Sequence, residues 1–362
     1  MNQAFVFTVP DCKQARILSM MKKFQIVDYE FFNTKFVAHQ EQTNLRRINL
    51  NSGAFDPDVV TKKYLSQDET LDYIDKMAAK ISQANPKIIV AVQTEGHSYE
   101  SRPIKSISIV HSERVNNPVI FIDAGIHARE WHSRSMALYL LNRFVDEAAL
   151  DTEGLLYKAS FMILPTVNPD GYEFSRNGNN MWRKTRSPVS SNCIGVDGNR
   201  NFDVHWWEGE TEKKPCFDVY RGPKPFSELE TKIVRDIMRR LKSNIKMYIT
   251  LHTFGNMIVY PYGYTTTKHY RHEQLANVAQ AGVDAVLEET GVMFTADQSG
   301  SSMYVAAGGS DDYAIEIGIP FAYTFELGAE ELGFSVPEIF LNKTLNEGYI
   351  GIKAMVLQVI KM

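Results

Sequence analysis

The stretch Pro118-Val-Ile-Phe-Ile-Asp123, with Gly125-Ile-His-Ala-Arg-Glu-Trp131 after it, decides the fold expected for this chain. Its first part is an unbroken apolar run, which is typical of a buried strand in a parallel sheet. His127 and Glu130 then follow the carboxyl end of that strand, where open α/β sheets bind ligands. One helical turn brings positions i and i+3 onto the same side, so the imidazole and the carboxylate can converge on one ion. Nitrogen plus carboxylate suits zinc.

Two further segments are expected to be strands that end in a reactive side chain. Residues 247–252 are rich in β-forming residues and stop at His252, just before the chain turns. Residues 321–326 end in Glu326, and burying a glutamate is costly unless the group is paired or takes part in chemistry. A lone H-x-x-E pair is most often a chance surface arrangement. Three strand ends that deliver two histidines and two glutamates instead predict one shared site.

From about Tyr64 to the C-terminus, the chain resembles the zinc metallocarboxypeptidases of the pancreatic type, the M14 family. The resemblance implies that His127, Glu130 and His252 bind one zinc ion per chain. It also implies that Glu326, in the motif Phe-Glu-Leu, is the catalytic carboxylate. The substrates expected on this basis are the C-termini of peptides and proteins, and proteinaceous carboxypeptidase inhibitors are expected partners.

The resemblance also implies which residues bind the substrate. Each stands where the family's pattern has a residue of the same type. They are Arg183 for the scissile carbonyl, Asn199 and Arg200 for the terminal carboxylate, Tyr304 as the mobile tyrosine that caps the site, and Arg129 as an auxiliary substrate-binding arginine.

The chemistry of peptide hydrolysis asks for these residue types independently of any family. Zinc held by three protein ligands keeps a fourth position for water and lowers the pKa of that water. Glu326 can accept a proton as general base and return it to the leaving amine. Arg183 is always charged and can stabilise an oxyanion. Arg200 can meet a terminal carboxylate with two parallel hydrogen bonds, a feature that internal peptide bonds lack.

Asp197 and Asp311 are expected to tune the site. Asp197 matches the residue that orients a zinc-binding histidine in the family, and the alternative is a loop aspartate that caps a turn.

Asp311 matches the floor of the pocket for the terminal side chain, where aspartate marks the B type and a preference for Lys and Arg. The alternative is that Asp312 is the buried residue and Asp311 a turn residue. Ser299 stands where the B type usually has glycine.

Composition agrees with a secreted, extracellular enzyme. The chain has 362 residues, 44% hydrophobic and 23% charged, with a formal net charge of -4, so nothing indicates nucleic-acid binding. It has no window of about 18 uncharged apolar residues, so no membrane span is expected. The start lacks the features of a signal peptide, and we expect the export signal to have been removed. Whether the sequon at Asn342 is glycosylated is left open.

The three cysteines indicate an oxidising compartment. Cys193 and Cys216 match the positions of a disulfide in the family, and disulfides persist outside the reducing cytosol. Cys12 is then left without a partner in this scheme.

Residues 1–47 are expected to form a shortened activation segment before a catalytic domain at residues 48–362. Residues 3–9 and 25–32 look like strands, and a helix with an apolar stripe begins at Asp11. The dibasic pair ending at Arg47 predicts cleavage by a trypsin-like activating protease. The segment is about half the length of the family's pro-domains, so either it is short or residues precede those given.

The catalytic part is predicted to be an α/β sandwich. The capping box Ser66-Gln-Asp-Glu69 begins a helix with an apolar stripe. Strands are expected at residues 88–92, 106–110, 118–123, 161–165, 247–252 and 321–326, and helices at 135–147, 228–241 and 345–360. Alternation of strands and helices favours helices on both faces of a sheet. The resemblance implies a mixed eight-stranded sheet, sandwiched between helices and preceded by the short α+β pro-segment.

The sequence leaves three alternatives to a B-type peptidase. One is an A-type carboxypeptidase that prefers aromatic or aliphatic C-terminal residues. Another is a catalytically silent relative that binds C-terminal peptides, although all three zinc ligands and the general base are present. The last is a relative that deacylates or deglutamylates other substrates, although Asn199, Arg200, Tyr304 and Asp311 fit ordinary C-terminal cleavage better.

Overall fold

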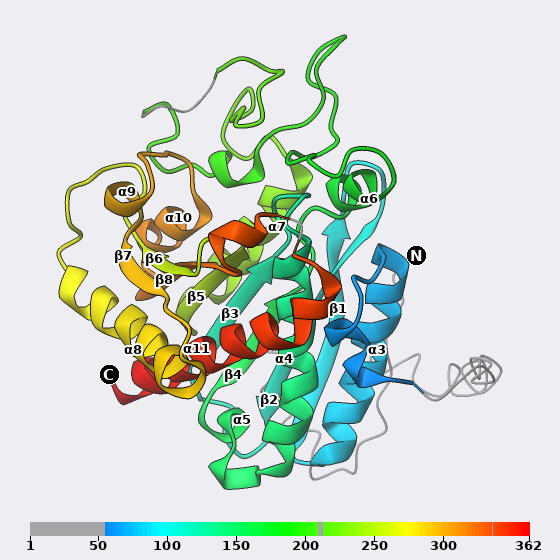
Figure 1. The fold of residues 1–362 in the computed structure, drawn as a ribbon, viewed down its shortest axis with the longest axis vertical. Coiled ribbons are helices and arrows are strands. Elements are labelled where there is room, and N and C mark those ends of the chain that lie inside the picture. The colour runs from blue at the N-terminus through cyan, green and yellow to red at the C-terminus, as the bar shows by residue number, and fades with distance from the viewer. Residues whose placement is uncertain (1–54, 209–212, 335) are drawn as a thin grey trace.

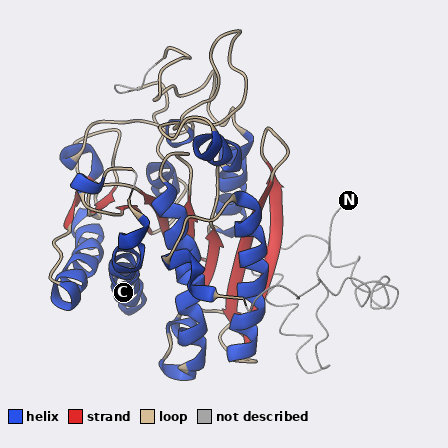
Figure 2. Ribbon diagram, turned by 45° about the vertical axis from the view of Figure 1, so that its right-hand side comes forward, coloured by secondary structure: helices blue, strands red, loops and turns tan. Residues whose placement is uncertain are grey.

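The computed structural model describes residues 55–208, 213–334 and 336–362. Within these ranges a mixed eight-stranded sheet lies between layers of helices (Figures 1 and 2), which confirms the expected fold class. The predicted activation segment, with its strands at 3–9 and 25–32, its helix from Asp11 and its cleavage site at Arg47, lies outside the described residues.

The sheet has the strand order β1-β2-β4-β3-β5-β8-β6-β7. Its central strands β4, β3, β5 and β8 run parallel, whereas the pairs β1–β2, β2–β4 and β8–β6 are antiparallel. Every residue of β3, β4 and β8 is buried, as expected for parallel strands covered on both faces. The strands are β1 (Ile88–His97), β2 (Pro103–His111), β3 (Val119–Ala124), β4 (Ser160–Leu164), β5 (Ile245–His252), β6 (Met257–Tyr260), β7 (Thr295–Gln298) and β8 (Phe321–Glu326).

Helices cover both faces of the sheet. In Figure 1, α3, α4, α11 and α8 lie next to one another over one face, and α7 and α10 pack on the other. The helices are α3 (Gln67–Ala84), α4 (Trp131–Ala149), α5 (Leu155–Lys158), α6 (Pro169–Asn177), α7 (Leu229–Leu241), α8 (His272–Thr290), α9 (Ser299–Ser302), α10 (Ser310–Glu316) and α11 (Leu341–Lys361). No helix in the described part of the chain is long and apolar enough to cross a membrane.

The start of α3 confirms the predicted capping box. Glu69 N donates to Ser66 Oγ at 3.2 Å, and Ser66 N donates to Glu69 Oε2 at 2.8 Å. The predicted apolar stripe is buried at Ile74, Met77 and Ile81. Two of the four orphan amides at this helix end are thereby satisfied, and the stripe fixes the face that packs on the sheet.

Helix α4 begins at Trp131, four residues before the predicted start at Ser135. Glu130 is the residue before the helix, yet its side chain makes no capping hydrogen bond. The prediction missed this start because no Ser, Thr, Asp or Asn marks it. The Glu130 carboxylate is instead directed at two histidines.

The end of β3 turns through Gly125, which has φ +68. A Cβ at this position would lie 2.7 Å from Arg134 Cγ, so both the backbone conformation and the space favour glycine. This turn leads directly to His127. Because β3, β5 and β8 are parallel, their carboxyl ends lie at the same edge of the sheet.

Candidate metal and catalytic site

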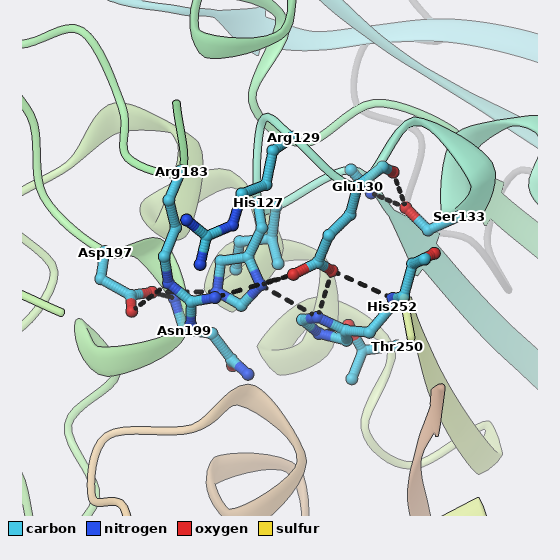
Figure 3. A network of polar contacts seen from close by, with 12 residues as sticks. His127, Arg129, Glu130, Ser133, Arg183, Asp197, Asn199, Thr250 and His252 are labelled. Carbon is cyan, nitrogen blue, oxygen red and sulfur yellow. Dashed lines mark hydrogen bonds and ion pairs between the residues drawn. The ribbon is translucent and has the colours of Figure 1, made fainter. Parts of the chain in front are cut away.

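His127, Glu130 and His252 converge at this edge (Figure 3). His127 Nδ1 lies 2.8 Å from Glu130 Oε1, and His252 Nδ1 lies 2.9 Å from Glu130 Oε2. The two Nδ1 atoms are 3.1 Å apart, and all three side chains are buried. The predicted i, i+3 pairing is also present in the backbone, where Glu130 N donates to His127 O at 3.2 Å.

The outer nitrogen of each imidazole has its own partner. His127 Nε2 lies 3.0 Å from Asp197 Oδ1, and His252 Nε2 lies 3.2 Å from Thr250 Oγ1. When each Nε2 carries the hydrogen, both Nδ1 lone pairs face the Glu130 carboxylate. Such a set of electron-rich atoms requires a cation, and two histidines with one carboxylate are a known ligand set for catalytic zinc. The residues therefore fit zinc.

The pKa shifts of the ligands also indicate a site for a cation. Burial alone would lower the pKa of His252, but the Glu130 and Glu326 carboxylates raise it to about 9. Burial would raise the pKa of Glu130, but the charges of His127 and His252 hold it below its ordinary value. The site therefore stabilises positive charge at its centre, which a divalent cation supplies.

Asp197 contacts both a zinc-binding histidine and the turn that follows it. Burial would raise its pKa, but the charges of Arg183, His127 and Arg200 hold the pKa well below its ordinary value. Its Oδ1 faces His127 Nε2 and also accepts from Asn199 N at 2.9 Å, which caps the 3₁₀ turn Gly198–Arg200. One carboxylate therefore both contacts the histidine and caps the turn.

Arg183 lies between the two carboxylates of this site. Its Nε donates to Asp197 Oδ2 at 2.9 Å, and one terminal nitrogen lies 3.7 Å from Glu130 Oε1. Burial would lower its pKa, but the charges of Asp197 and Glu130 raise it above the ordinary value. The guanidinium is therefore held permanently charged beside the metal ligands (Figure 3).

Glu326 lies beside His252, at the partner position on β8. Its Oε2 has no hydrogen-bond partner within the described residues, and the side chain is 7% exposed. Burial raises its pKa to about 8; Glu130 adds to this rise, whereas His252 and Arg183 oppose it. A divalent cation nearby would favour the ionised form and lower this pKa. The Glu326 side chain is thus a buried carboxyl group beside a metal ligand, with one oxygen that no described residue bonds.

Arg200, Tyr304 and Asn199 form a second group at the edge of the site. One terminal nitrogen of Arg200 donates to Tyr304 Oη at 3.0 Å, and another donates to Asn199 O at 2.8 Å. Arg200 is buried, but Tyr304 is 55% exposed. Asn199 Oδ1 accepts from Ser310 N at 2.9 Å, which leaves its amide hydrogens for another acceptor.

Asp311 and Asp312 are both buried. The alternative in which Asp312 is the buried residue and Asp311 only a turn residue is therefore wrong. Asp312 accepts hydrogen bonds from Gly263 N and Tyr264 N, at 2.9 and 3.0 Å, and so supports a loop. Asp311 Oδ2 accepts from Thr324 Oγ1 at 3.1 Å. Burial raises the pKa of Asp311. Thr324 is thus the side-chain donor to Asp311, whereas the side chain of Asp312 is held by the backbone of a loop.

Arg129 lies at the rim. It donates to Met181 O at 3.2 Å and to Asp218 Oδ2 at 3.1 Å, and its guanidinium lies 4.3 Å from the centroid of the Phe334 ring. The interaction with Phe334 is a cation–π contact. These partners could not be predicted from the sequence, because they come from separate loops.

A disulfide joins Cys193 to Cys216 and closes the loop that the resemblance implied. Cys12 lies outside the described residues. Thr250, which was not predicted from the sequence, also contacts a metal ligand. Its signal was available, because residues i and i+2 of a strand lie on the same face and Thr250 precedes His252 by two.

Comparison with known proteins agrees with this geometry. The family profile described as zinc carboxypeptidase matches residues 72–351. Carboxypeptidase B of Astacus astacus is 37% identical over 296 residues, which cover 81% of this chain and 95% of that relative. Carboxypeptidase A2 of Rattus norvegicus is 36% identical over 296 residues, which cover 81% of this chain and 69% of that relative.

Solved structures show the same fold. Bovine thrombin-activatable fibrinolysis inhibitor, in complex with tick carboxypeptidase inhibitor, matches with a TM-score of 0.76 at 33% identity over 83% of this chain and 99% of its own. Carboxypeptidase A from Helicoverpa armigera matches with a TM-score of 0.76 at 28% identity, over 89% of this chain and 81% of its own. Two histidines and a glutamate in metal-binding geometry, within a matching family profile, lead to one conclusion: the chain belongs to the zinc carboxypeptidase family, M14.

Proposed function

We propose that this metallocarboxypeptidase removes C-terminal Lys and Arg residues from peptides and proteins. The proposed preference for Lys and Arg rests on Asp311. This carboxylate is buried, and the structure gives it one side-chain hydrogen-bond donor, Thr324. A carboxylate that is poorly solvated is stabilised by a cationic side chain and not by an apolar one. A guanidinium or ammonium group of the substrate would offset the cost of its burial.

The residues around the zinc ligands have complementary roles in this proposal. Zinc supplies a Lewis acid and a water of lowered pKa when it is bound. Glu326 accepts the proton of the attacking water at its free Oε2 and returns the proton to the leaving amine. Arg183, held by Asp197, donates to the carbonyl oxygen as negative charge develops there. Hydrolysis therefore needs no further protein group in direct contact with the scissile bond.

Recognition of the chain end is assigned to Arg200, Asn199 and Tyr304. The Arg200 guanidinium pairs with the terminal carboxylate of the substrate, and the free amide hydrogens of Asn199 add donors. Tyr304 is exposed and bonded to Arg200, so it must exchange this bond when the carboxylate arrives. Arg129 binds the substrate chain at the rim. Internal peptide bonds have no terminal carboxylate, which makes the enzyme an exopeptidase.

An A-type preference for aromatic or aliphatic ends is the second candidate. The relatives named carboxypeptidase B and carboxypeptidase A2 are almost equally similar to this chain, at 37% and 36% identity. The charge of Asp311 favours the B type. Ser299, which stands where the B type usually has glycine, forms part of α9.

Activation, secretion and inhibition are further parts of the proposal. The dibasic pair ending at Arg47 favours a zymogen that a trypsin-like protease activates. The disulfide between Cys193 and Cys216 favours an oxidising, extracellular compartment. The bovine relative is in complex with tick carboxypeptidase inhibitor, which supports proteinaceous inhibitors as partners.

The test of the preference is Asp311→Asn, which keeps the shape of the side chain and removes its charge. Matched acylated dipeptides that end in Arg or Phe are compared by kcat/KM. We expect the wild type to prefer Arg, and the variant to lose about 10- to 150-fold on the Arg substrate, the value of a hydrogen bond to a charged group. Preference of the wild type for Phe, or an unchanged preference for Arg in the variant, would contradict the B-type assignment.

A further inference from the structure

A polar row crosses the sheet directly beneath the zinc-binding histidine of β5. Asp123, Thr250 and Thr324 are partner positions on the parallel strands β3, β5 and β8, so their side chains point to the same face. His252 and Glu326 lie two residues further along β5 and β8, on that same face. Asp123 and Thr250 have no exposed surface. A carboxylate in the middle of a sheet is costly and needs partners.

A hydrogen bond connects Thr250 of this row to His252, and another holds Asp123. Thr250 Oγ1 lies 3.2 Å from His252 Nε2, and Figure 3 shows the two side chains next to each other. Asp123 Oδ2 accepts from the Tyr248 hydroxyl at 2.7 Å. Burial raises the pKa of Asp123 to about 6, although the neighbouring Tyr248 and Thr250 hydroxyls oppose this rise. Asp123 Oδ1 has no hydrogen-bond partner within the described residues.

The direction of these bonds follows from the metal site. A metal-binding imidazole uses the lone pair of one nitrogen, so its other nitrogen carries the hydrogen. His252 presents Nδ1 to Glu130 and His127, and its Nε2 must then donate to Thr250 Oγ1. The Thr250 hydroxyl accepts on that side, which leaves its own hydrogen for a second acceptor. Asp123 Oδ1 is a buried acceptor for which the described part of the chain provides no hydrogen-bond partner.

We propose that Asp123 is a positioning residue for zinc, acting on His252 through the Thr250 hydroxyl. The carboxylate accepts the hydroxyl hydrogen, the hydroxyl oxygen accepts from Nε2, and the imidazole is held in the tautomer and orientation that present Nδ1 to the metal. Asp197 has the equivalent task for His127 by direct contact. The inference depends on the zinc site alone and not on the substrate preference.

The experiment measures the zinc dissociation constant of the full chain by competition with a chromophoric chelator. Thr250→Val keeps the shape of the side chain but removes the hydroxyl, whereas Thr250→Ser keeps the hydroxyl. Loss of an outer partner of a ligating histidine weakens metal binding by roughly 10- to 100-fold. We expect that loss for Thr250→Val and for Asp123→Asn, and wild-type affinity for Thr250→Ser. The visible absorption bands of the Co²⁺-substituted protein should shift in the first two variants only.

A double variant separates positioning from a general loss of polarity. Because Asp123 acts through Thr250, adding Asp123→Asn to Thr250→Val should weaken zinc binding little further. The matched control is Thr324→Val, which removes a hydroxyl of the same row that bonds Asp311 and should leave zinc affinity unchanged. Thermal unfolding of the metal-free proteins checks that each variant folds, and Thr250→Ala replaces Thr250→Val if the latter does not.

Several outcomes would overturn the proposal. One is that Thr250→Val or Asp123→Asn binds zinc with wild-type affinity. Another is that the losses of zinc affinity in these two variants add fully in the double variant. The third is that Thr324→Val loses as much zinc affinity as Thr250→Val. A wild-type chain that binds no zinc would instead contradict the metal site itself, so the two failures are distinguishable.

Discussion

His252 and Glu326 are direct partners in the register of the parallel strands β5 and β8, each at the last residue of its strand. The backbone hydrogen bonds of the sheet therefore fix a metal ligand relative to the proposed general base. Sites built on strands hold their geometry better than sites built on loops alone. The two roles can also be separated by mutation, because Glu326 is not among the three residues grouped as metal ligands.

Glu326→Gln should lower kcat by about 10² to 10⁴, the range for a positioned proton acceptor, and leave zinc content unchanged. Gln has nearly the same shape but cannot take the proton. Steady-state kinetics on a C-terminal Arg substrate and metal analysis of the same sample check both parts. Turnover at the wild-type rate would refute the role of Glu326.

His127→Ala and His252→Ala should each lose stoichiometric zinc, because two remaining ligands cannot complete a tetrahedral site. The measurement is metal content after dialysis against buffer without chelator. His269→Gln is a matched control, since His269 is also buried but bonds Arg271 N in another part of the chain. About one equivalent of zinc in either Ala variant, or its loss in the control, speaks against the assigned ligands.

Glu230 of α7 should make the fold less stable as pH rises. The side chain is 1% exposed, and burial raises its pKa to about 7 from an ordinary value of 4.5. Between these values the folded state keeps a proton that the unfolded state has released. The free energy of unfolding therefore falls with rising pH through this window, by up to about 3 kcal/mol.

Glu230→Gln should remove this dependence and stabilise the protein at pH 8 relative to the wild type, whereas the difference should be smaller at pH 5. Denaturant unfolding at the two pH values measures it. Asp236→Asn removes an exposed carboxylate of the same helix and is the control. An equal effect of Glu230→Gln at both pH values would show that burial does not perturb this carboxyl group.

Trypsin should cut after Arg47 and raise activity towards small substrates. Residues 1–47 have seven basic and four acidic side chains, whereas the whole chain is net negative, so electrostatic attraction would help to hold the segment. N-terminal sequencing and rates before and after digestion check this. Cleavage at Arg47 with unchanged rates means that the segment is not inhibitory.

The central strands and the zinc ligands could be predicted because their signals are local. The apolar runs of β5 and β8 end in His252 and Glu326, and that of β3 is followed within a few residues by His127 and Glu130. Every segment predicted in the described part overlaps an observed element of the same type. For these segments the periodicity was sufficient.

Two of the elements that were not predicted lack such signals. Strand β7 (Thr295–Gln298) is a short edge strand without an apolar run. Helix α6 (Pro169–Asn177) begins Asn-Pro-Asp-Gly, which is typical of a turn, although Asn168 Oδ1 caps it by accepting from Gly171 N. The contacts of Arg129 with Asp218 and Phe334 join distant loops and follow only from the tertiary structure.

The most direct test of the account is mass spectrometry of a peptide mixture with varied C-termini, incubated with the activated protein in the presence and absence of a zinc chelator. We expect single C-terminal Lys or Arg residues to be lost, release to stop with the chelator, and added zinc to restore it. Cleavage at internal bonds, release that survives removal of the metal, or no release at all would contradict the account.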